Sequence, residues 1–199
     1  MKLFHAPGTR SARVLWLLEE LGADYELETM AATRAERATP DHMLRHPLGR
    51  VPVLEQDEGL LFESTALLLQ LADQHLEAGM IGLLGSHRRG LVYQWSIFCM
   101  TELEPALGEM LRDPEPGRAR FREVAAALES AVAADGFLAG DSFSVADVVC
   151  GGIFTVGRRV GLIDSAALAE FPRLAAYLAA LDSRPAKQRA YGEAPSQHR

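Results

Sequence analysis

The apolar residues of this chain change their spacing near residue 76, and this change most constrains the fold. Before it, short apolar runs alternate with helical patterns, whereas after Ser86 the long segments carry apolar residues at i, i+3 and i+4. The segment between them contains Gly79, Gly82 and Gly85. We therefore predict a small α/β domain over residues 1–76, a linker over 77–85 and an all-α domain over 86–199.

The first domain has the element order of a thioredoxin-like fold. Strands are predicted at 2–5 and 24–30, separated by a turn and a helix that ends at Gly22. A short helix from Pro40, a hairpin around a Gln-Asp-Glu-Gly turn and a helix from Ser64 to about His75 follow. This order predicts a mixed sheet with helices on its faces.

The charge balance argues against two classes of partner. The 199 residues carry a formal net charge of −7, whereas nucleic acid and anionic lipid both bind basic faces. No window approaches the roughly 20 uninterrupted apolar residues that a membrane span needs, and no signal-like apolar region follows Met1. We therefore expect a cytoplasmic protein with no nucleic-acid partner and no membrane partner.

The two cysteines favour packing over chemistry. Cys99 and Cys150 are far apart in the sequence, and each lies within an apolar helical pattern. Cysteine in such a setting behaves as a small core hydrophobe, and no Cys-x-x-Cys pair is present. We therefore predict no metal site.

The stretch from Arg50 to Ser64 raises the question of a ligand. Pro52 stands at the entry to a strand, where it donates nothing to a ladder, so one interpretation is an edge-strand proline without a functional purpose. Ser64 begins a helix, and its hydroxyl with the following N–H groups can bind an anion, while Glu63 can pair with an ammonium group. The alternative for Ser64 is a simple N-cap worth about 1 kcal/mol.

Three motifs carry a resemblance to a known family. They are "KLFHAPGTRSARVLWLLEELG", "HPLGRVPVLEQDEGLLFESTALLLQLAD" and "FLAGDSFSVADV". In this order and at these separations, the chain resembles a cytosolic glutathione transferase, of a bacterial type, from end to end. The resemblance implies a thioredoxin-like N-terminal domain followed by an all-α C-terminal domain, which is the glutathione transferase fold.

The resemblance also implies a glutathione-binding set. A cis bond between Val51 and Pro52 would turn the Val51 backbone toward the cysteinyl part of glutathione. Glu63 and Ser64 would hold the γ-glutamyl head group, and Arg50 the glycine carboxylate. Arg45 and His46 would add positive potential nearby.

The loop "PGTRSAR" is where the family activates the thiol of glutathione. The resemblance places a catalytic hydroxyl nearest Thr9 when compared with serine-dependent members, and a catalytic cysteine at Arg10 when compared with cysteine-dependent members. Ser11 is the third candidate. An alternative for Thr9 and Ser11 is capping of the helix that follows.

The motif in the helical domain is structural. Ser144 and Asp147 have the spacing of a capping box, with Asp in place of Glu. We expect Asp147 to be buried and to hold the start of a helix. The residues do not specify the site for a second substrate, although an aromatic and polar series runs along one helix: Tyr93, Trp95, Phe98, Met100 and Thr101.

The resemblance implies a detoxification enzyme that binds glutathione as a substrate, without a metal. It would be a homodimer and would conjugate the glutathione thiolate to a small hydrophobic electrophile. The alternatives are a glutathione-dependent isomerase or peroxidase, and a non-catalytic glutathione- or ligand-binding module of the same fold. The lack of an unambiguous catalytic tyrosine, serine or cysteine in the loop favours the non-catalytic module, whereas Val51-Pro52 and Glu63-Ser64 argue against it, since a pure scaffold need not retain them.

Overall fold

The computed structural model describes residues 1–132 and 136–192. These residues form two compact units, which are described separately below. Unit 1 comprises Met1–His75 together with the chain from Arg184 onward, and unit 2 comprises Leu76–Ser183. Residues 133–135 and 193–199 lie outside the described ranges.

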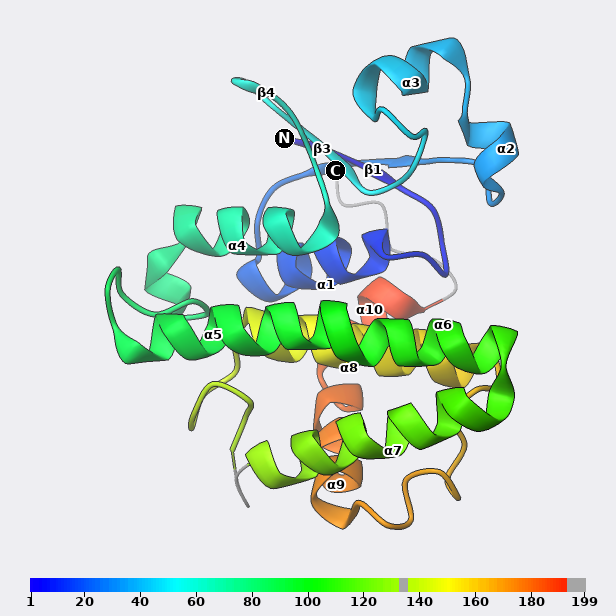
Figure 1. The fold of residues 1–199 in the computed structure, drawn as a ribbon. Coiled ribbons are helices and arrows are strands. Elements are labelled where there is room, and N and C mark those ends of the chain that lie inside the picture. Colours follow the sequence, from blue (N-terminus) through cyan, green and yellow to red (C-terminus); the bar gives the residue numbers. More distant parts are fainter. Residues whose placement is uncertain (133–135, 193–199) are drawn as a thin grey trace. The chain divides into compact units, whose positions relative to one another are not determined.

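Unit 1 is built on a mixed four-stranded sheet in the order β2-β1-β3-β4 (Figure 1). The strands are β1 (Lys2–His5), β2 (Glu26–Thr29), β3 (Val53–Gln56) and β4 (Gly59–Phe62). β1 is parallel to β2 and antiparallel to β3, with Phe4 opposite Val53. β3 and β4 form the hairpin that the sequence predicts.

Four helices lie between or beside these strands. They are α1 (Ser11–Leu21), α2 (Arg34–Arg37), α3 (Pro40–Arg45) and α4 (Ser64–Gln74). α1 and α4 pack together on one face of the sheet (Figure 1). α1 ends where Gly22 takes a left-handed conformation with φ of 60°, as expected of a C′ glycine. The short helix α2 was not predicted; a capping box of Thr33 and Glu36 starts it.

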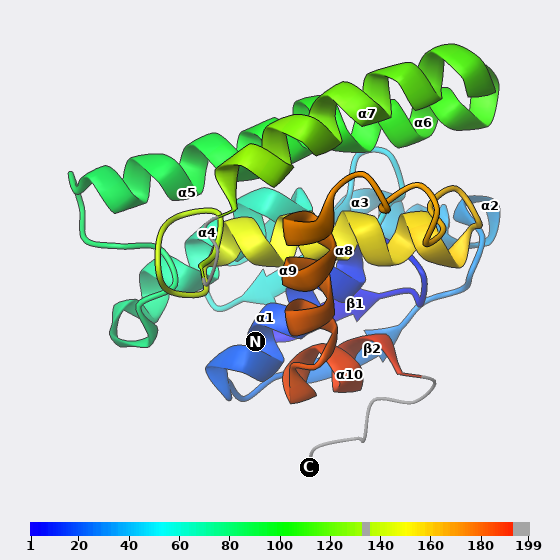
Figure 2. The same cartoon turned by 90° about the horizontal axis from the view of Figure 1, so that it is seen from below.

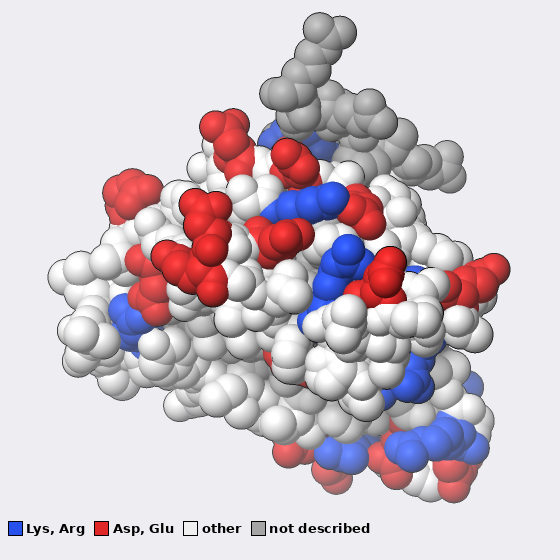
Figure 3. All heavy atoms as spheres, turned by 90° about the horizontal axis from the view of Figure 1, so that it is seen from above, with Lys and Arg blue, Asp and Glu red and all other residues white. Residues whose placement is uncertain are grey.

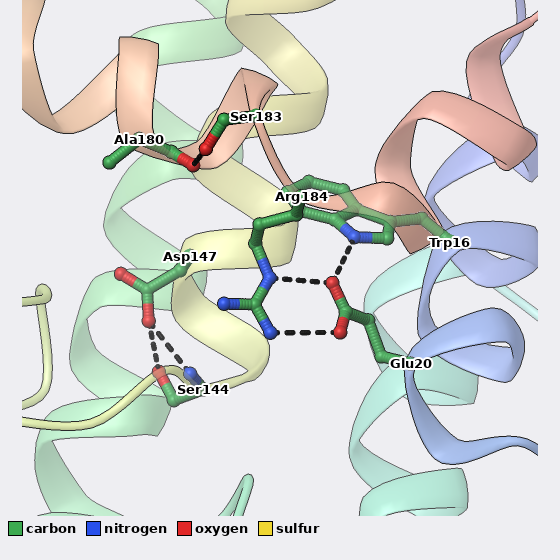
Figure 4. Close-up of polar contacts among 7 residues, drawn as sticks. All are labelled: Trp16, Glu20, Ser144, Asp147, Ala180, Ser183 and Arg184. Carbon is green, nitrogen blue, oxygen red and sulfur yellow. Dashed lines mark hydrogen bonds and ion pairs between the residues drawn. The ribbon is translucent and has the colours of Figure 1, made fainter.

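A last helix, α10 (Pro185–Tyr191), packs on α1 in unit 1 (Figure 2). The Arg184 guanidinium donates to both Glu20 oxygens at 2.6 and 2.8 Å, and the Trp16 indole N–H donates to the same carboxylate (Figure 4). The Lys187 ammonium lies 5.0 Å from the centre of the Trp16 ring. The C-terminal boundary therefore differs from the predicted one, because these long-range contacts tie α10 to the first unit.

Unit 2 is helical, as the apolar spacing predicts. Its elements are the 3-10 turn η1 (Leu76–Ala78), α5 (His87–Phe98), the π-helical turn η2 (Cys99–Leu103), α6 (Glu104–Arg112), α7 (Pro114–Ala131), α8 (Val145–Arg159) and α9 (Pro172–Asp182). The π turn ends two residues before Pro105, which lacks an N–H and whose ring crowds the carbonyl four residues earlier. Cys99 and Cys150 are free and buried, and burial raises the pKa of the Cys150 thiol.

The predicted linker is partly packed into unit 2. The Val145 N–H donates to the Met80 carbonyl at 3.0 Å, and Ile81 is fully buried. The segment 77–85 therefore includes residues that belong to the core of the helical unit.

The start of α8 confirms the predicted capping box. The Ser144 N–H and hydroxyl both donate to Asp147 Oδ2 at 2.8 Å (Figure 4). Asp147 Oδ1 accepts from the Leu138 N–H at 3.0 Å and from the Tyr177 hydroxyl at 2.7 Å. Asp147 is completely buried, and this burial raises the pKa of its carboxyl group. Asp147 therefore joins three segments of unit 2.

Candidate functional site

The loop between β1 and α1 holds the three predicted catalytic residues, and the structure separates their environments. Ser11 is the first residue of α1 and is completely buried, whereas Thr9 is half-buried and Arg10 is exposed. Arg10 is the N-cap and makes no capping bond through its side chain. The Thr9 hydroxyl makes a capping contact at this helix start, because its oxygen accepts from the Ser11 N–H at 3.3 Å, whereas Ser11 lies within the helix.

The Ser11 hydroxyl is engaged inside the fold. It accepts from the Ala6 N–H at 3.1 Å, and its oxygen lies 2.8 Å from His5 Nδ1. The imidazole of His5 is buried, and this burial lowers its pKa from 6.5 to about 4. His5 is therefore neutral near pH 7, and Ser11 ties the loop to β1.

The Thr9 hydroxyl is closer to the surface but also has partners. It donates to the Ala6 carbonyl at 2.7 Å, and it lies 2.8 Å from Ser11 Oγ. It also accepts from the Ser11 N–H at 3.3 Å. Since a hydroxyl has one proton, Thr9 must give up its bond to Ala6 before it can donate to a thiolate.

The segment before β3 contains the predicted cis bond. The Val51–Pro52 peptide bond is cis, as the resemblance implied. Val51 packs in a buried cluster with Ala6, Phe4 and Val53, and this cluster places the segment beside the loop before α1. No hydrogen bond joins the Val51 N–H or C=O to another residue of the described ranges.

Gly49 shapes the approach to this segment. Its φ is 58°, and a Cβ at this position would lie 3.0 Å from Ala38 Cβ and 3.1 Å from Met43 Sδ. Glycine therefore allows the chain to turn closely against α3 just before Arg50. The Arg50 side chain itself is exposed.

The start of α4 is unusual in two ways. Glu63, its N-cap, has φ of 74° and is the one non-glycine residue with positive φ in the described chain. Such a conformation costs about 1–3 kcal/mol and is concentrated at functional sites. Ser64 Oγ and Thr65 Oγ1 are buried and have no hydrogen-bond partner among the described residues. Ser64 therefore does not act as the N-cap.

Two buried histidines lie next to this region: His42, which was not among the predicted site residues, and His46, which was expected to add positive potential. His42 Nε2 lies 2.9 Å from the Arg50 carbonyl, and His46 Nδ1 accepts from the Leu48 N–H at 3.0 Å. The sequence signal was present, since the two residues form a His-x-x-x-His pair. The pair is not arranged around one point, because His46 follows the end of α3 and its ring lies against Phe62.

His46 does not contribute the positive charge that we expected. Burial lowers the pKa of its imidazole, and the Arg50 charge acts in the same direction, while Glu63 opposes both. Its Nδ1 is an acceptor, so the ring is neutral near pH 7. The Arg45 guanidinium lies 4.8 Å from the centre of the Phe4 ring.

The aromatic series on α5 and η2 is divided between surface and interior. Tyr93 is exposed and accepts from Arg89 Nε at 2.7 Å, whereas Trp95 and Phe98 are half-buried with ring centres 5.3 Å apart. Met100 is half-buried, and Thr101 is exposed. Their role toward a second substrate stays a prediction.

Three further observations concern the surface charges, the helices and metal-binding groups. Acidic and basic side chains are interspersed on the face of the described chain seen from above (Figure 3). The structure also contains an ion pair between Lys2 and Glu28, with 2.5 Å between the ammonium and the carboxylate. No helix of the described ranges has the length and apolar character to cross a membrane. The described residues also contain no cluster of three side chains suited to hold a metal ion.

Comparisons with known proteins agree with this architecture. Residues 1–73 match the family model "Glutathione S-transferase, N-terminal domain", and residues 73–180 match "Glutathione S-transferase, C-terminal domain". Glutathione S-transferase 4 of Zea mays is 30% identical over 191 residues, which cover 88% of this chain and 84% of that protein. The chain belongs to the glutathione S-transferase family.

Solved structures show the same fold. A glutathione transferase from Methylococcus capsulatus has a TM-score of 0.85 and 29% identity, with 96% of each chain covered. A sphingomonad glutathione S-transferase, solved in complex with glutathione, has a TM-score of 0.80 and 32% identity, covering 96% of this chain and 97% of that one. The predicted glutathione transferase fold is therefore confirmed.

Proposed function

We propose that this protein binds glutathione and conjugates its thiolate to a small hydrophobic electrophile. The observation that carries the proposal is the start of α4. Glu63 is held at φ of 74°, and the buried Ser64 hydroxyl lacks a partner among the described residues. A polar group buried without a partner costs about 1–3 kcal/mol, which a ligand would recover by bonding to it.

In this proposal each end of glutathione has its own residues. The γ-glutamyl carboxylate bonds to Ser64 and the first N–H groups of α4, and Glu63 pairs with the adjacent ammonium. Val51, before Pro52, bonds to the cysteinyl part through its N–H and C=O, which have no other partner in the described chain. Arg50 attracts the glycine carboxylate.

We assign activation of the glutathione thiol to the loop before α1, and we rank Thr9 and Arg10 above Ser11 as the activating residues. Lowering a thiol pKa by about 2 units from ~8.5 needs about 2.7 kcal/mol of preference for the thiolate. A hydrogen bond to a charged group supplies roughly 1.5–3 kcal/mol, and a helix N-terminus roughly 0.3–1 kcal/mol. Donation from Thr9, the N-terminus of α1 and the charge of Arg10 together would suffice.

The thiolate absorbance of bound glutathione, followed against pH, tests this assignment. We expect the parent protein to ionise the thiol well below pH 8.5, and Thr9→Ala to move the midpoint back by more than about one unit. Arg10→Ala should move it less. Ser11→Ala is the matched control, which should lower the melting temperature and leave the midpoint in place. An unchanged midpoint in both Thr9→Ala and Arg10→Ala would contradict the assignment.

A non-catalytic glutathione-binding module is the second candidate, and the loop gives it support. The Thr9 and Ser11 hydroxyls already have partners within the loop and β1. Turnover of an activated aryl halide distinguishes the two functions, since a module would bind glutathione without forming the conjugate. Peroxide and isomerisation substrates, assayed in parallel, test the remaining activities. Absence of glutathione binding at millimolar concentration would remove the conjugation proposal.

We also propose a cytoplasmic homodimer. The strand β4 supports a self-association surface, because it lies at the edge of the sheet and all four of its residues are exposed. Its Leu60, Leu61 and Phe62 side chains each have a relative exposure of about 40%. Exposed apolar strands at a sheet edge are favoured sites of association. The mass in solution, measured by sedimentation, tests the dimer.

A further inference from the structure

The ring of His42 is buried beside the segment that the proposed function assigns to glutathione. His42 lies on α3, which starts with the cap residue Thr39 and with Pro40. The His42 side chain is completely buried, and its ring lies 6.2 Å from that of Phe4. The ring therefore has a fixed place against β1.

The polar contact of this ring has a defined direction. His42 Nε2 lies 2.9 Å from the Arg50 carbonyl oxygen. Because a carbonyl oxygen only accepts, Nε2 must carry the proton. His42 Nδ1 is buried and makes no hydrogen bond within the described residues. A buried histidine nitrogen without a hydrogen-bond partner lowers the stability of the fold, and an apolar ring would fill the same space without this cost. What the histidine provides and an apolar ring does not is the bond from Nε2 to the Arg50 carbonyl.

This bond also orients the neighbouring N–H. The Arg50 carbonyl and the Val51 N–H belong to one peptide unit, and this unit is trans. In a planar trans peptide the C=O and the N–H point in opposite directions. A carbonyl held toward His42 therefore directs the Val51 N–H away from α3, and that N–H has no partner in the described chain.

We infer that His42 is a positioning residue for glutathione: its Nε2–H holds the Arg50 carbonyl and thereby aims the Val51 N–H at the ligand. The inference rests on the proposed function, because glutathione is the ligand that Val51 would bind. His42 itself would not touch glutathione. Its loss should therefore weaken glutathione binding without changing the chemical step.

Three variants and glutathione titration test the inference. His42→Phe keeps an aromatic ring and removes the donor, and we expect the Kd for glutathione to rise about tenfold. His42→Gln places an amide N–H near the position of Nε2 and should return the Kd to within about twofold of the parent. Tyr25→Phe is the matched control, because it removes the 2.5 Å bond from Tyr25 to Glu19 elsewhere in unit 1.

Kinetics separate positioning from general damage. His42→Phe should raise the KM for glutathione and leave kcat at saturating glutathione, and the KM for the electrophile, near the parent values. Tyr25→Phe should lower the melting temperature and leave the Kd unchanged. If His42→Phe does not fold, His42→Asn replaces it, since the shorter amide does not reach the Arg50 carbonyl while His42→Gln does.

The outcomes distinguish this inference from the proposed function. A parent protein that binds no glutathione overturns both. If the parent binds glutathione and the donor-lacking variant binds it equally well, the inference fails and the proposed function stands. An equal loss of binding in His42→Gln, or in Tyr25→Phe, would likewise overturn a positioning role.

Discussion

The starts of α4 and α8 look alike in the sequence and differ in the structure. Both have a serine and an acidic residue at the beginning of an apolar helical pattern. At α8 the Ser144 hydroxyl and N–H reach Asp147, and each Asp147 oxygen has two donors. At α4 the Ser64 hydroxyl has no partner in the described chain, and Glu63 has a left-handed backbone.

This difference separates a stabilising helix start from one suited to binding. Buried polar groups in native proteins are almost always satisfied, so a satisfied cluster such as that of Asp147 contributes to folding. An unsatisfied hydroxyl beside a strained residue lowers stability unless something binds it. We therefore expect the start of α8 to increase the free energy of unfolding, and the start of α4 to contribute to the affinity for a ligand.

Asp147→Ala should give the largest effect. It removes the acceptor of four hydrogen bonds in the core of unit 2, so we expect a loss of roughly 3–5 kcal/mol in the free energy of unfolding. Thermal and urea melting measure it. Glutathione affinity of the folded fraction should not change. Normal melting of Asp147→Ala would refute the structural role, and Asp147→Asn, which keeps an acceptor oxygen, should lose less.

Mild acid should affect the two units differently. The pKa of His5 is lowered from 6.5 to about 4 by burial, so the unfolded chain takes up this proton at a higher pH than the folded one. Stability should therefore fall as the pH drops from about 6.5 to about 4, by about 3 kcal/mol in total, and then level off. Burial of His46 acts in the same direction.

Amide hydrogen exchange at pH 7 and pH 5 locates this loss. Unit 1 should lose protection, whereas in unit 2 the one histidine of the described residues, His87, is exposed. His5→Asn, whose side chain can still bond to Ser11, should flatten the pH dependence of unit 1. Equal acid sensitivity in the parent and in His5→Asn would show that His5 is not the cause.

The two serines give the smallest effects and the most direct comparison. Ser144→Ala should lower the free energy of unfolding by about 1 kcal/mol, because a capping hydroxyl is lost. Ser64→Ala removes no bond within the described chain and removes a buried hydroxyl without a partner there, so the free energy of unfolding without ligand should rise, by about 1 kcal/mol. Glutathione titration should give the reverse order, with a Kd about tenfold higher in Ser64→Ala alone. A destabilised Ser64→Ala with unchanged affinity would make α4 an ordinary capped helix.

Much of the local structure could be predicted from the sequence, since it depends on neighbouring residues. Apolar spacing indicated α1, α4 and the helices of unit 2, the position of Gly22 indicated where α1 ends, and the spacing of Ser144 and Asp147 indicated a capping box. Such features arise from the backbone preferences and hydrogen bonds of nearby residues. The family resemblance also predicted the cis peptide bond between Val51 and Pro52.

Tertiary contacts decided the rest, because they join residues that no local pattern connects. α10 belongs to unit 1 because Arg184 bonds to Glu20, which lies 164 residues earlier. The two hydroxyls of the loop before α1 could be ranked only when the buried His5 and Ala6 were seen around Ser11. His42 and Arg50 are eight residues apart, yet their bond depends on how α3 packs against β1. The sequence by itself determined the fold and the family, and packing decided which polar groups are satisfied and which remain available to a ligand.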